Sequence, residues 1–316
     1  MTATEIRAEH TTLVDAPAST VYGLITQVAH WPVLFGPTVH TQVLERSRQG
    51  DRFQIWALVS GAVNSWRSRR YFDPVARRVS FRQDHENPLF GLMRGGWTCG
   101  ERPDGTTKVV LEHRFTPPPD QVDARERIER DLDRNGTAEL EALRTVAALP
   151  GGPARWMLTF SESLDLAGNS EAAREFVWDA ERWPERLPHV AGLELAEPSD
   201  RTQDMTMSTR APDGSVHATR SIRVLLDDGS VVYKQTRPPR VLLGHSGRWE
   251  FPTGPAGAAI RSTHTVLLDP AGVAEVYGPS TSPEEAVDRV RTALAANSRV
   301  TMEHASRYDA SIGAAR

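Results

Sequence analysis

One predicted strand carries four side chains that could do chemistry inside a cavity. In SWRSRRYF (65–72) alternate residues share a face, and one face carries Trp66, Ser68, Arg70 and Phe72. This face combines two aromatic ring systems with a hydroxyl and a guanidinium. An inward guanidinium is costly unless a polar group occupies the space with it, so the pattern favours a polar ligand. The alternative is that the other face is buried and that Arg70 is a solvated surface charge.

Two polar residues interrupt apolar patterns elsewhere in the chain. His113 follows Val109 and Leu111 on the apolar face of another predicted strand, and Asn135 lies on the apolar stripe of a long predicted helix. Either residue could face the same cavity as Arg70. His113 could equally be a core residue with satisfied hydrogen bonds, and Asn135 a helix residue bonded to water.

Other kinds of chemistry lack their sequence motifs. The chain has no Gly-x-Gly-x-x-Gly after a strand, no phosphate-binding loop, no Gly-x-Ser-x-Gly and no His-x-x-x-His pair. Its one cysteine, Cys99, cannot form an internal disulfide framework or a cysteine-based metal cluster. We therefore expect neither a metal nor a cofactor.

The composition bounds the class of protein. Apolar residues make up 39% and charged residues 25% of the chain, as in soluble globular proteins. A net charge of −4 gives no reason to expect nucleic acid or an anionic membrane as partner. The first residues do not resemble a signal peptide, and no stretch is apolar enough to span a bilayer. We expect a cytoplasmic protein.

The 316 residues contain one internal duplication. Trp31-Pro32 and Trp183-Pro184 lie 152 residues apart. Further landmarks follow in the same order at spacings of 152 or 151: Phe81-Arg82-Gln83 and Tyr233-Lys234-Gln235, Trp97 and Trp249, His113 and His264. Near the end of each half, Asn135 in the first long helix corresponds to Asn297 in the second. The segment ALPGGP (148–153) cannot continue a helix, because proline lacks an N–H and glycine favours other conformations. We expect two domains, 1–150 and 151–316.

Each half repeats one order of elements. The pattern is a strand, short helices around Trp-Pro, several strands with alternating apolar residues, and one long helix, over 120–147 and 283–308. This order predicts an α+β fold in which a curved antiparallel sheet wraps around a long C-terminal helix. A strongly curved sheet and a helix do not close fully on each other. An internal cavity is therefore expected.

The landmarks of the first half resemble those of a known family. They are Trp31-Pro32-x-x-Phe35, Trp66-x-Ser68-x-Arg70, Phe81-Arg82, Gly96-Trp97-Thr98 and the helical Asn135. Together they resemble the aromatase/cyclases of bacterial type II polyketide synthases, and the duplication resembles the di-domain subclass. The resemblance covers essentially the whole chain. It implies a tandem pair of helix-grip domains, the fold shared with START-type lipid carriers.

The resemblance also implies an activity and partners. Such a protein is expected to bind a poly-β-ketone presented on an acyl carrier protein and to work beside other synthase subunits. It would direct the first-ring aldol condensation and the dehydrations that aromatise the ring, without a cofactor. Di-domain members are associated with ketoreduced chains that close between carbons seven and twelve.

The resemblance assigns roles to individual residues. Arg70 is the leading catalytic candidate, and Ser68, Arg82 and His113 are further polar members of the pocket. The expected substrate-binding residues are Trp31, Phe35, Trp66 and Trp97 in the walls and Asn135 on the helix side. At position 38 this chain has Thr38 where single-domain relatives have a tyrosine, which puts a phenol proton donor there in doubt.

The second half has the same pattern with different polar residues. At an offset of 151, Trp66, Ser68 and Arg70 correspond to His217, Thr219 and Ser221, while Lys234, His264 and Asn297 remain as polar candidates. Because the arginine is lost in this alignment, we expect a catalytically weak or supportive second pocket. Two alternatives remain open: a non-catalytic START-like carrier of a hydrophobic ligand, and a regulatory protein whose tandem halves form an interaction surface.

Overall fold

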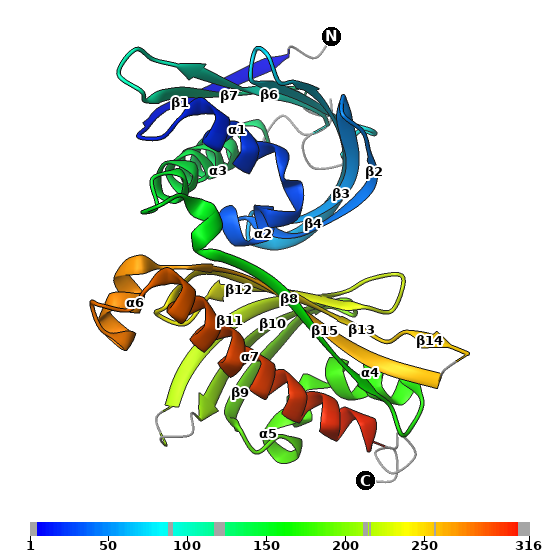
Figure 1. The fold of residues 1–316 in the computed structure, drawn as a ribbon. Coiled ribbons are helices and arrows are strands. Elements are labelled where there is room, and N and C mark those ends of the chain that lie inside the picture. Colours follow the sequence, from blue (N-terminus) through cyan, green and yellow to red (C-terminus); the bar gives the residue numbers. More distant parts are fainter. Residues whose placement is uncertain are drawn as a thin grey trace. The chain divides into compact units, whose positions relative to one another are not determined.

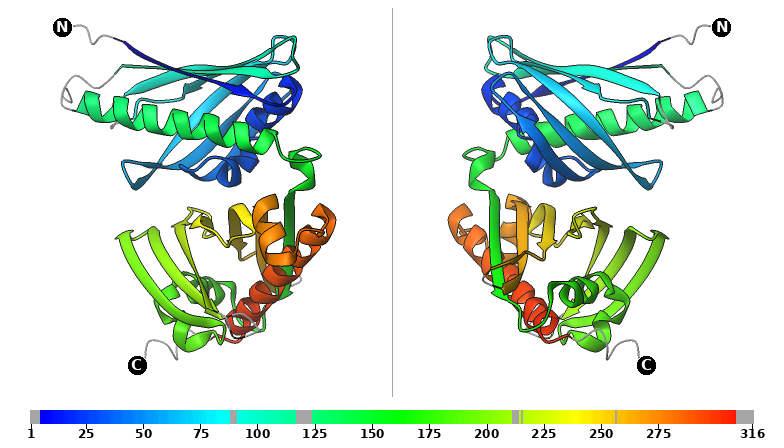
Figure 2. Two further views of the ribbon diagram at one scale, coloured as in Figure 1. Left: turned by 90° about the vertical axis from the view of Figure 1, so that its left-hand side faces the viewer. Right: turned by 90° about the vertical axis from the view of Figure 1, so that its right-hand side faces the viewer.

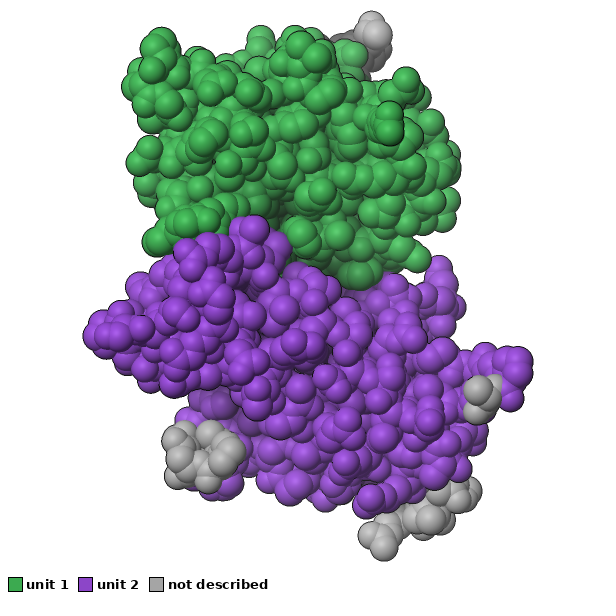
Figure 3. Space-filling view, viewed as in Figure 1, with its two compact units in different colours: residues 1–153 green, residues 154–316 purple. Residues whose placement is uncertain are grey.

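The computed structural model describes residues 5–87, 91–116, 124–210, 214, 216–255 and 257–308. The chain divides into two compact units, residues 1–153 and 154–316 (Figure 3). The division falls just after the Pro-Gly-Gly-Pro segment in which we expected it. No helix in the described ranges is long and apolar enough to cross a membrane.

The first unit is a seven-stranded antiparallel sheet in the order β1-β7-β6-β5-β4-β3-β2. Its elements along the chain are β1 (Ile6–Val14), α1 (Ala18–Thr26), η1 (Val28–His30), α2 (Trp31–Leu34), β2 (Thr38–Arg46), β3 (Gly50–Val59), β4 (Ala62–Asp73), β5 (Arg78–Gln83), β6 (Leu92–Glu101), β7 (Thr107–Thr116) and α3 (Ala124–Ala147). The sheet curves around α3 (Figures 1 and 2). The expected start of this helix, 120–123, lies outside the described residues.

Helix α3 packs against β1 through a close approach of backbone to side chain. A Cβ atom at Gly136 would lie 2.7 Å from Nδ1 of His10, so a larger residue there would force the helix away from the sheet. On the inner face of α3, Ile128, Leu140 and Leu143 are buried. The amphipathic stripe predicted from the sequence is therefore the face that closes the unit.

The second unit repeats this architecture. Its elements are η2 (Pro153–Arg155), β8 (Met157–Asp165), α4 (Ser170–Trp178), η3 (Ala180–Arg182), α5 (Trp183–Arg186), β9 (Val190–Ser199), β10 (Thr202–Arg210), β11 (Val216–Leu225), β12 (Val231–Arg237), β13 (Leu242–Glu250), β14 (Thr253–Gly254), β15 (Gly257–Leu268), α6 (Pro270–Tyr277) and α7 (Pro283–Ser306). Its sheet runs β14-β15-β13-β12-β11-β10-β9, with β8 paired to β15. The hydroxyl of Ser282 caps α7 by accepting the N–H of Glu285 at 3.1 Å.

Candidate active site

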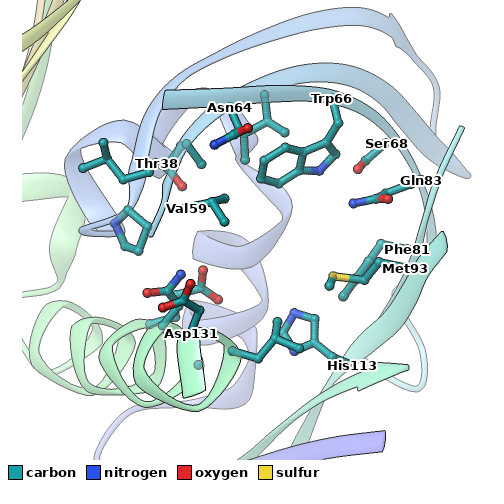
Figure 4. A pocket seen from close by; sticks show the side chains of 18 of the residues that line it. Thr38, Val59, Asn64, Trp66, Ser68, Phe81, Gln83, Met93, His113 and Asp131 are labelled. Atoms are coloured by element: carbon teal, nitrogen blue, oxygen red, sulfur yellow. The ribbon is translucent and has the colours of Figure 1, made fainter. Parts of the chain in front are cut away.

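A cavity of about 420 Å³ lies in the first unit between the curved sheet and α3 (Figure 4). Most of its lining is aromatic or aliphatic: Trp31, Pro37, Phe53, Ile55, Ala57, Leu58, Val59, Ala62, Trp66, Phe81, Met93, Trp97, Ile128 and Leu132. The polar lining residues are Thr38, Ser60, Asn64, Ser68, Arg70, Gln83, His113, Arg127, Asp131, Asn135 and Glu139. A mostly apolar hollow with a few converging polar groups is typical of a small-molecule site.

Three of the four aromatic residues expected in the walls line the cavity directly. Trp31, Trp66 and Trp97 are lining residues. Phe35 lies behind them and is only 1% exposed. Its ring stacks on Trp97 with centroids 6.0 Å apart and meets Trp31 edge-on at 5.3 Å. The expectation that Phe35 forms wall surface is therefore wrong, because it supports the indoles from the core side.

Arg70 projects inward from β4, as the alternation of the strand predicts, and is 1% exposed. Its guanidinium forms a two-point ion pair with Asp51, with Nε to Oδ1 at 2.8 Å and Nη2 to Oδ2 at 2.6 Å. It also donates to the carbonyls of Ile25 at 2.7 Å and Thr26 at 2.9 Å, at the end of α1. The alternative of a solvated surface arginine is excluded by this burial.

Ser68 and Arg82 have opposite orientations. Ser68 is buried and lines the cavity two residues before Arg70 (Figure 4). Arg82 is exposed, because Phe81 and Gln83 take the inward positions of β5 and the residue between them must point outward. The expectation that Arg82 lies in the pocket is wrong. Gln83, which the sequence analysis did not select, takes the inward polar position.

His113 faces the cavity from β7 (Figure 4). Its ring lies edge-on to Phe81 with centroids 5.4 Å apart, and its Nδ1 has no hydrogen-bond partner in the described part of the chain. Burial, and secondarily the neighbouring His10, lower the pKa of His113 to about 4. The imidazole is therefore neutral at physiological pH. The alternative of a core histidine with both nitrogens satisfied does not fit this geometry.

Helix α3 contributes one polar face to the cavity. Asn135 lines it as expected, together with Asp131 one turn earlier and Glu139 one turn later. Burial raises the pKa of Glu139 to about 8, so this carboxyl is mainly protonated at neutral pH. The hydroxyl of Ser60, at the tip of the β3–β4 hairpin, hydrogen-bonds to Asp131. The sequence analysis missed Glu139, although its position four residues after Asn135 places it on the same helix face.

The second unit retains the buried arginine as Arg223. Arg223 lies directly opposite Gln203 in the β10–β11 ladder, as Arg70 lies opposite Asp51 in the β3–β4 ladder. It donates to the carbonyls of Val177 and Trp178 and to the side chain of Gln203. The expectation that this half has lost the arginine is wrong. The β10–β11 hairpin is one residue longer than the β3–β4 hairpin, so Arg223 lies 153 positions after Arg70, and a shorter β11–β12 connection restores the offset of 152 at Tyr233.

A chain of buried hydrogen bonds occupies the interior of the second unit. The Tyr233 hydroxyl lies 2.9 Å from Nδ1 of His264, which is 3.0 Å from Nε2 of His245. Nε2 of His264 lies 2.7 Å from the hydroxyl of Ser298. The expected inward residue of α7, Asn297, is exposed instead.

Lys234 also departs from its expected place in the second unit. The side chains on either side of it, Tyr233 and Gln235, both contact His245 in the interior. Since adjacent residues of a strand point to opposite faces, Lys234 points away from that interior. Lys234 is itself buried, at 6% exposure, on the opposite face of the strand from the histidines.

Comparison with known proteins agrees with this architecture. The sequence profile of the family "Polyketide cyclase / dehydrase and lipid transport" matches residues 14–138. The granaticin polyketide synthase bifunctional cyclase/dehydratase of Streptomyces violaceoruber is 43% identical, over 95% of this chain and 93% of the relative. The corresponding actinorhodin synthase protein of Streptomyces coelicolor is 41% identical, over 96% of each chain.

Solved structures extend the similarity to both units. The crystal structure of the di-domain ARO/CYC BexL from the BE-7585A biosynthetic pathway superposes with a TM-score of 0.79 at 40% identity, covering 96% of this chain and 98% of that one. The di-domain ARO/CYC StfQ from the steffimycin pathway gives a TM-score of 0.72 at 30% identity, covering 97% of this chain and 99% of that one. The predicted tandem of helix-grip domains is thus confirmed.

The fold and the cavity define a polyketide cyclase/dehydratase. The chain belongs to the di-domain aromatase/cyclases of the polyketide cyclase/dehydrase family. It is an enzyme of aromatic polyketide biosynthesis, and the named activity of its relatives favours this over a non-catalytic carrier.

Proposed function

We propose that the cavity of the first unit folds a ketoreduced poly-β-ketone, held on an acyl carrier protein, and closes its first ring between carbons seven and twelve. The observation that carries this proposal is an indole-walled hollow of about 420 Å³ with a buried guanidinium in its lining. The carrier protein and the other type II synthase subunits are the expected partners, and the cytoplasm is the expected compartment. The sequence involves no net oxidation or reduction, so proton transfer, carbon–carbon bond formation and loss of water suffice.

Ring closure needs an enolate and a single chain conformation. The methylene between two carbonyls is already acidic, and a donor fixed in a water-poor cavity stabilises the enolate oxygen as charge develops there. The guanidinium of Arg70 supplies that donor. The hydroxyl of Ser68, on the same face of the strand, supplies a second hydrogen-bonding group. The indoles of Trp31, Trp66 and Trp97 restrict the chain to one folded geometry. We assign the choice of ring mainly to this restriction.

Dehydration needs an acid at the leaving hydroxyl and a base at the adjacent carbon. The protonated carboxyl of Glu139 gives its proton to the hydroxyl, the C–O bond breaks, and water leaves. The electron pair of the adjacent C–H bond forms the C=C bond, and the freed carboxylate oxygen takes that proton. The carboxyl is thereby restored. The neutral His113, with its unpaired Nδ1, orients the hydroxyl by a hydrogen bond.

We assign a supportive role to the second unit. Its equivalent of the cavity-facing Phe81 is Tyr233, whose hydroxyl joins the His245–His264–Ser298 hydrogen bonds. Groups that satisfy one another in the interior are poorly available to a substrate.

Reconstitution of a minimal synthase with a ketoreductase, with and without this chain, tests the proposed function. We expect the products to shift from shunt compounds to a chain with an aromatised first ring. Arg70→Lys should abolish the shift, because an ammonium cannot make the two-point contact with Asp51. Arg223→Lys, in the second unit, is the matched control and should retain it. An unchanged product profile with the wild-type chain would refute the proposal.

A further inference from the structure

The guanidinium of Arg70 is almost fully committed to protein partners. An arginine has five N–H donors. Four hydrogen bonds, two to Asp51 and one each to the carbonyls of Ile25 and Thr26, use all but one donor, on Nη1. Asp51 is itself fully enclosed, with a side chain 0% exposed. A single N–H therefore remains for a group in the cavity.

Aromatic rings fix the plane of the same group. The guanidinium carbon lies 5.0 Å from the ring centroid of Trp31 and 5.2 Å from those of Phe53 and Phe72. A planar cation packed among rings and bonded at both edges cannot turn without losing several contacts. The direction of the remaining N–H is therefore set by the protein.

The second unit shows the same clamp with one partner changed. Val177, Trp178 and Gln203 lie 152 positions after Ile25, Thr26 and Asp51. The two carbonyl acceptors of the arginine are retained, but a neutral amide replaces the carboxylate. Burial then lowers the pKa of Arg223 to about 9. The duplicated chain thus keeps the arginine in both units, but a carboxylate bonds it directly only in the first; in the second, Gln203 lies between Arg223 and Glu197.

We propose that Asp51 is a positioning residue of the cyclisation: it holds Arg70 so that one N–H points into the cavity, and it cancels the charge of the guanidinium. The cavity end is then a directional hydrogen-bond donor whose positive charge is paired with the Asp51 carboxylate. Such a site receives a neutral polyketide carbonyl without desolvating a free cation, and it orders the carbonyl that becomes the enolate. Arg46, whose Nη1 lies 3.3 Å from Oδ2 of Asp51, is the second cation at this carboxylate. This inference rests on the proposed function of the same cavity.

The test exchanges the two partners between the units. Asp51→Gln gives the first unit the residue of the second, and Gln203→Glu gives the second unit a carboxylate. Each full-length variant is titrated into the reconstituted synthase and ketoreductase. We expect Asp51→Gln to lower the saturating fraction of aromatised product about tenfold while the half-saturating enzyme concentration stays the same, because orientation and not binding is lost. Gln203→Glu should behave as wild type.

A conservative variant keeps the test decisive if Asp51→Gln does not fold. Asp51→Glu retains the charge but moves the carboxylate by one methylene, so it should fold with a melting temperature lowered less than that of Asp51→Gln and still lose saturating yield. A folded Asp51→Gln or Asp51→Glu protein with wild-type yield would overturn the proposal. If the wild-type chain itself gave no aromatised product, the proposed function would fail instead, which separates the two results.

Discussion

Glu139 shows how position decides the chemistry of a common residue. On a helix surface a glutamate is usually a solvated anion, whereas here it lines a cavity walled by tryptophans. The charged or titratable groups that share this lining are Arg70, His113, Arg127 and Asp131. Burial raises the pKa of Glu139 to about 8. The residue can therefore serve as an acid at neutral pH.

Glu139→Gln should allow ring closure but block aromatisation, because the amide cannot protonate the leaving hydroxyl. We expect a cyclised, hydroxylated product to accumulate, measured by liquid chromatography and mass spectrometry. In the wild type the aromatised fraction should fall as the pH rises through about 8, where the carboxyl ionises. Glu141→Gln, on the exposed side of the same helix, is the control. A fully aromatised product from Glu139→Gln would rule out this role.

The carboxyl of Glu139 should also make the free energy of unfolding depend on pH. The pKa of Glu139 is higher in the folded than in the unfolded chain, so its contribution is complete below pH 4.5 and is lost as the pH rises toward 8. Glu139→Gln should therefore raise the melting temperature of the first unit at pH 9 and change it little at pH 4. Equal shifts at both pH values would contradict the buried, protonated state.

At the scale of elements, the outer face of the first sheet carries an unusual row of like charges. Arg52, Arg69, Arg82, Arg94 and Arg114 lie directly opposite one another on five neighbouring strands. Carboxylates pair with three of them, Arg52, Arg94 and Arg114. The positive charge of the row is therefore least compensated by carboxylates in its middle, at Arg69 and Arg82.

Arg82→Glu should stabilise the first unit by about 0.5 kcal/mol, because it places a carboxylate between two arginines and replaces like-charge by opposite-charge pairs. Urea unfolding at low salt is the measurement, and the gain should shrink as salt is added. Arg261→Glu is the contrasting variant, since Arg261 lies opposite Glu250 and Ser163. That change should not stabilise the protein. A destabilised Arg82→Glu protein would show that the row is compensated by other contacts.

The elements also show what the sequence could and could not predict. Period-two alternation placed Arg70 and Ser68 inward correctly because nothing interrupts β4. The same rule excludes Arg82 from the cavity, whereas the family resemblance implies a pocket role for Phe81 and Arg82 together. Arg223 could not be found from a fixed offset, because the extra residue of the β10–β11 hairpin is compensated by a shorter β11–β12 connection, which leaves the flanking landmarks in register.

At the scale of the whole molecule, the two units should respond differently to acid. The pKa of His264 is lowered to about 4 and that of His245 well below its usual value, both chiefly by burial. The unfolded chain takes up these protons near pH 6.5 and the folded unit does not. The stabilisation is therefore present above pH 6.5 and is lost as the pH falls toward 4.

Amide hydrogen exchange of the full chain at pH 7 and pH 5, corrected for intrinsic rates, tests this difference. Protection in β13 and β15 of the second unit should decrease more than protection in β6 and β7 of the first, where His113 is the corresponding group. His264→Gln should reduce the pH dependence of the second unit. Equal losses in both units would show that the buried histidines do not determine the acid response.

The bond between Ser60 and Asp131 joins a hairpin tip to a helix across the rim of the hollow. Ser60 holds its backbone at φ 51°, in the left-handed region, and the tip ends in Gly61. A hydrogen bond to a carboxylate contributes about 2 kcal/mol, far less than the pairing of a whole strand. The tip of the β3–β4 hairpin can therefore move away from α3 without breaking the hydrogen bonds between strands. A ligand longer than the cavity can therefore enter when the hydrogen bond between Ser60 and Asp131 breaks, while the strands of the sheet stay paired.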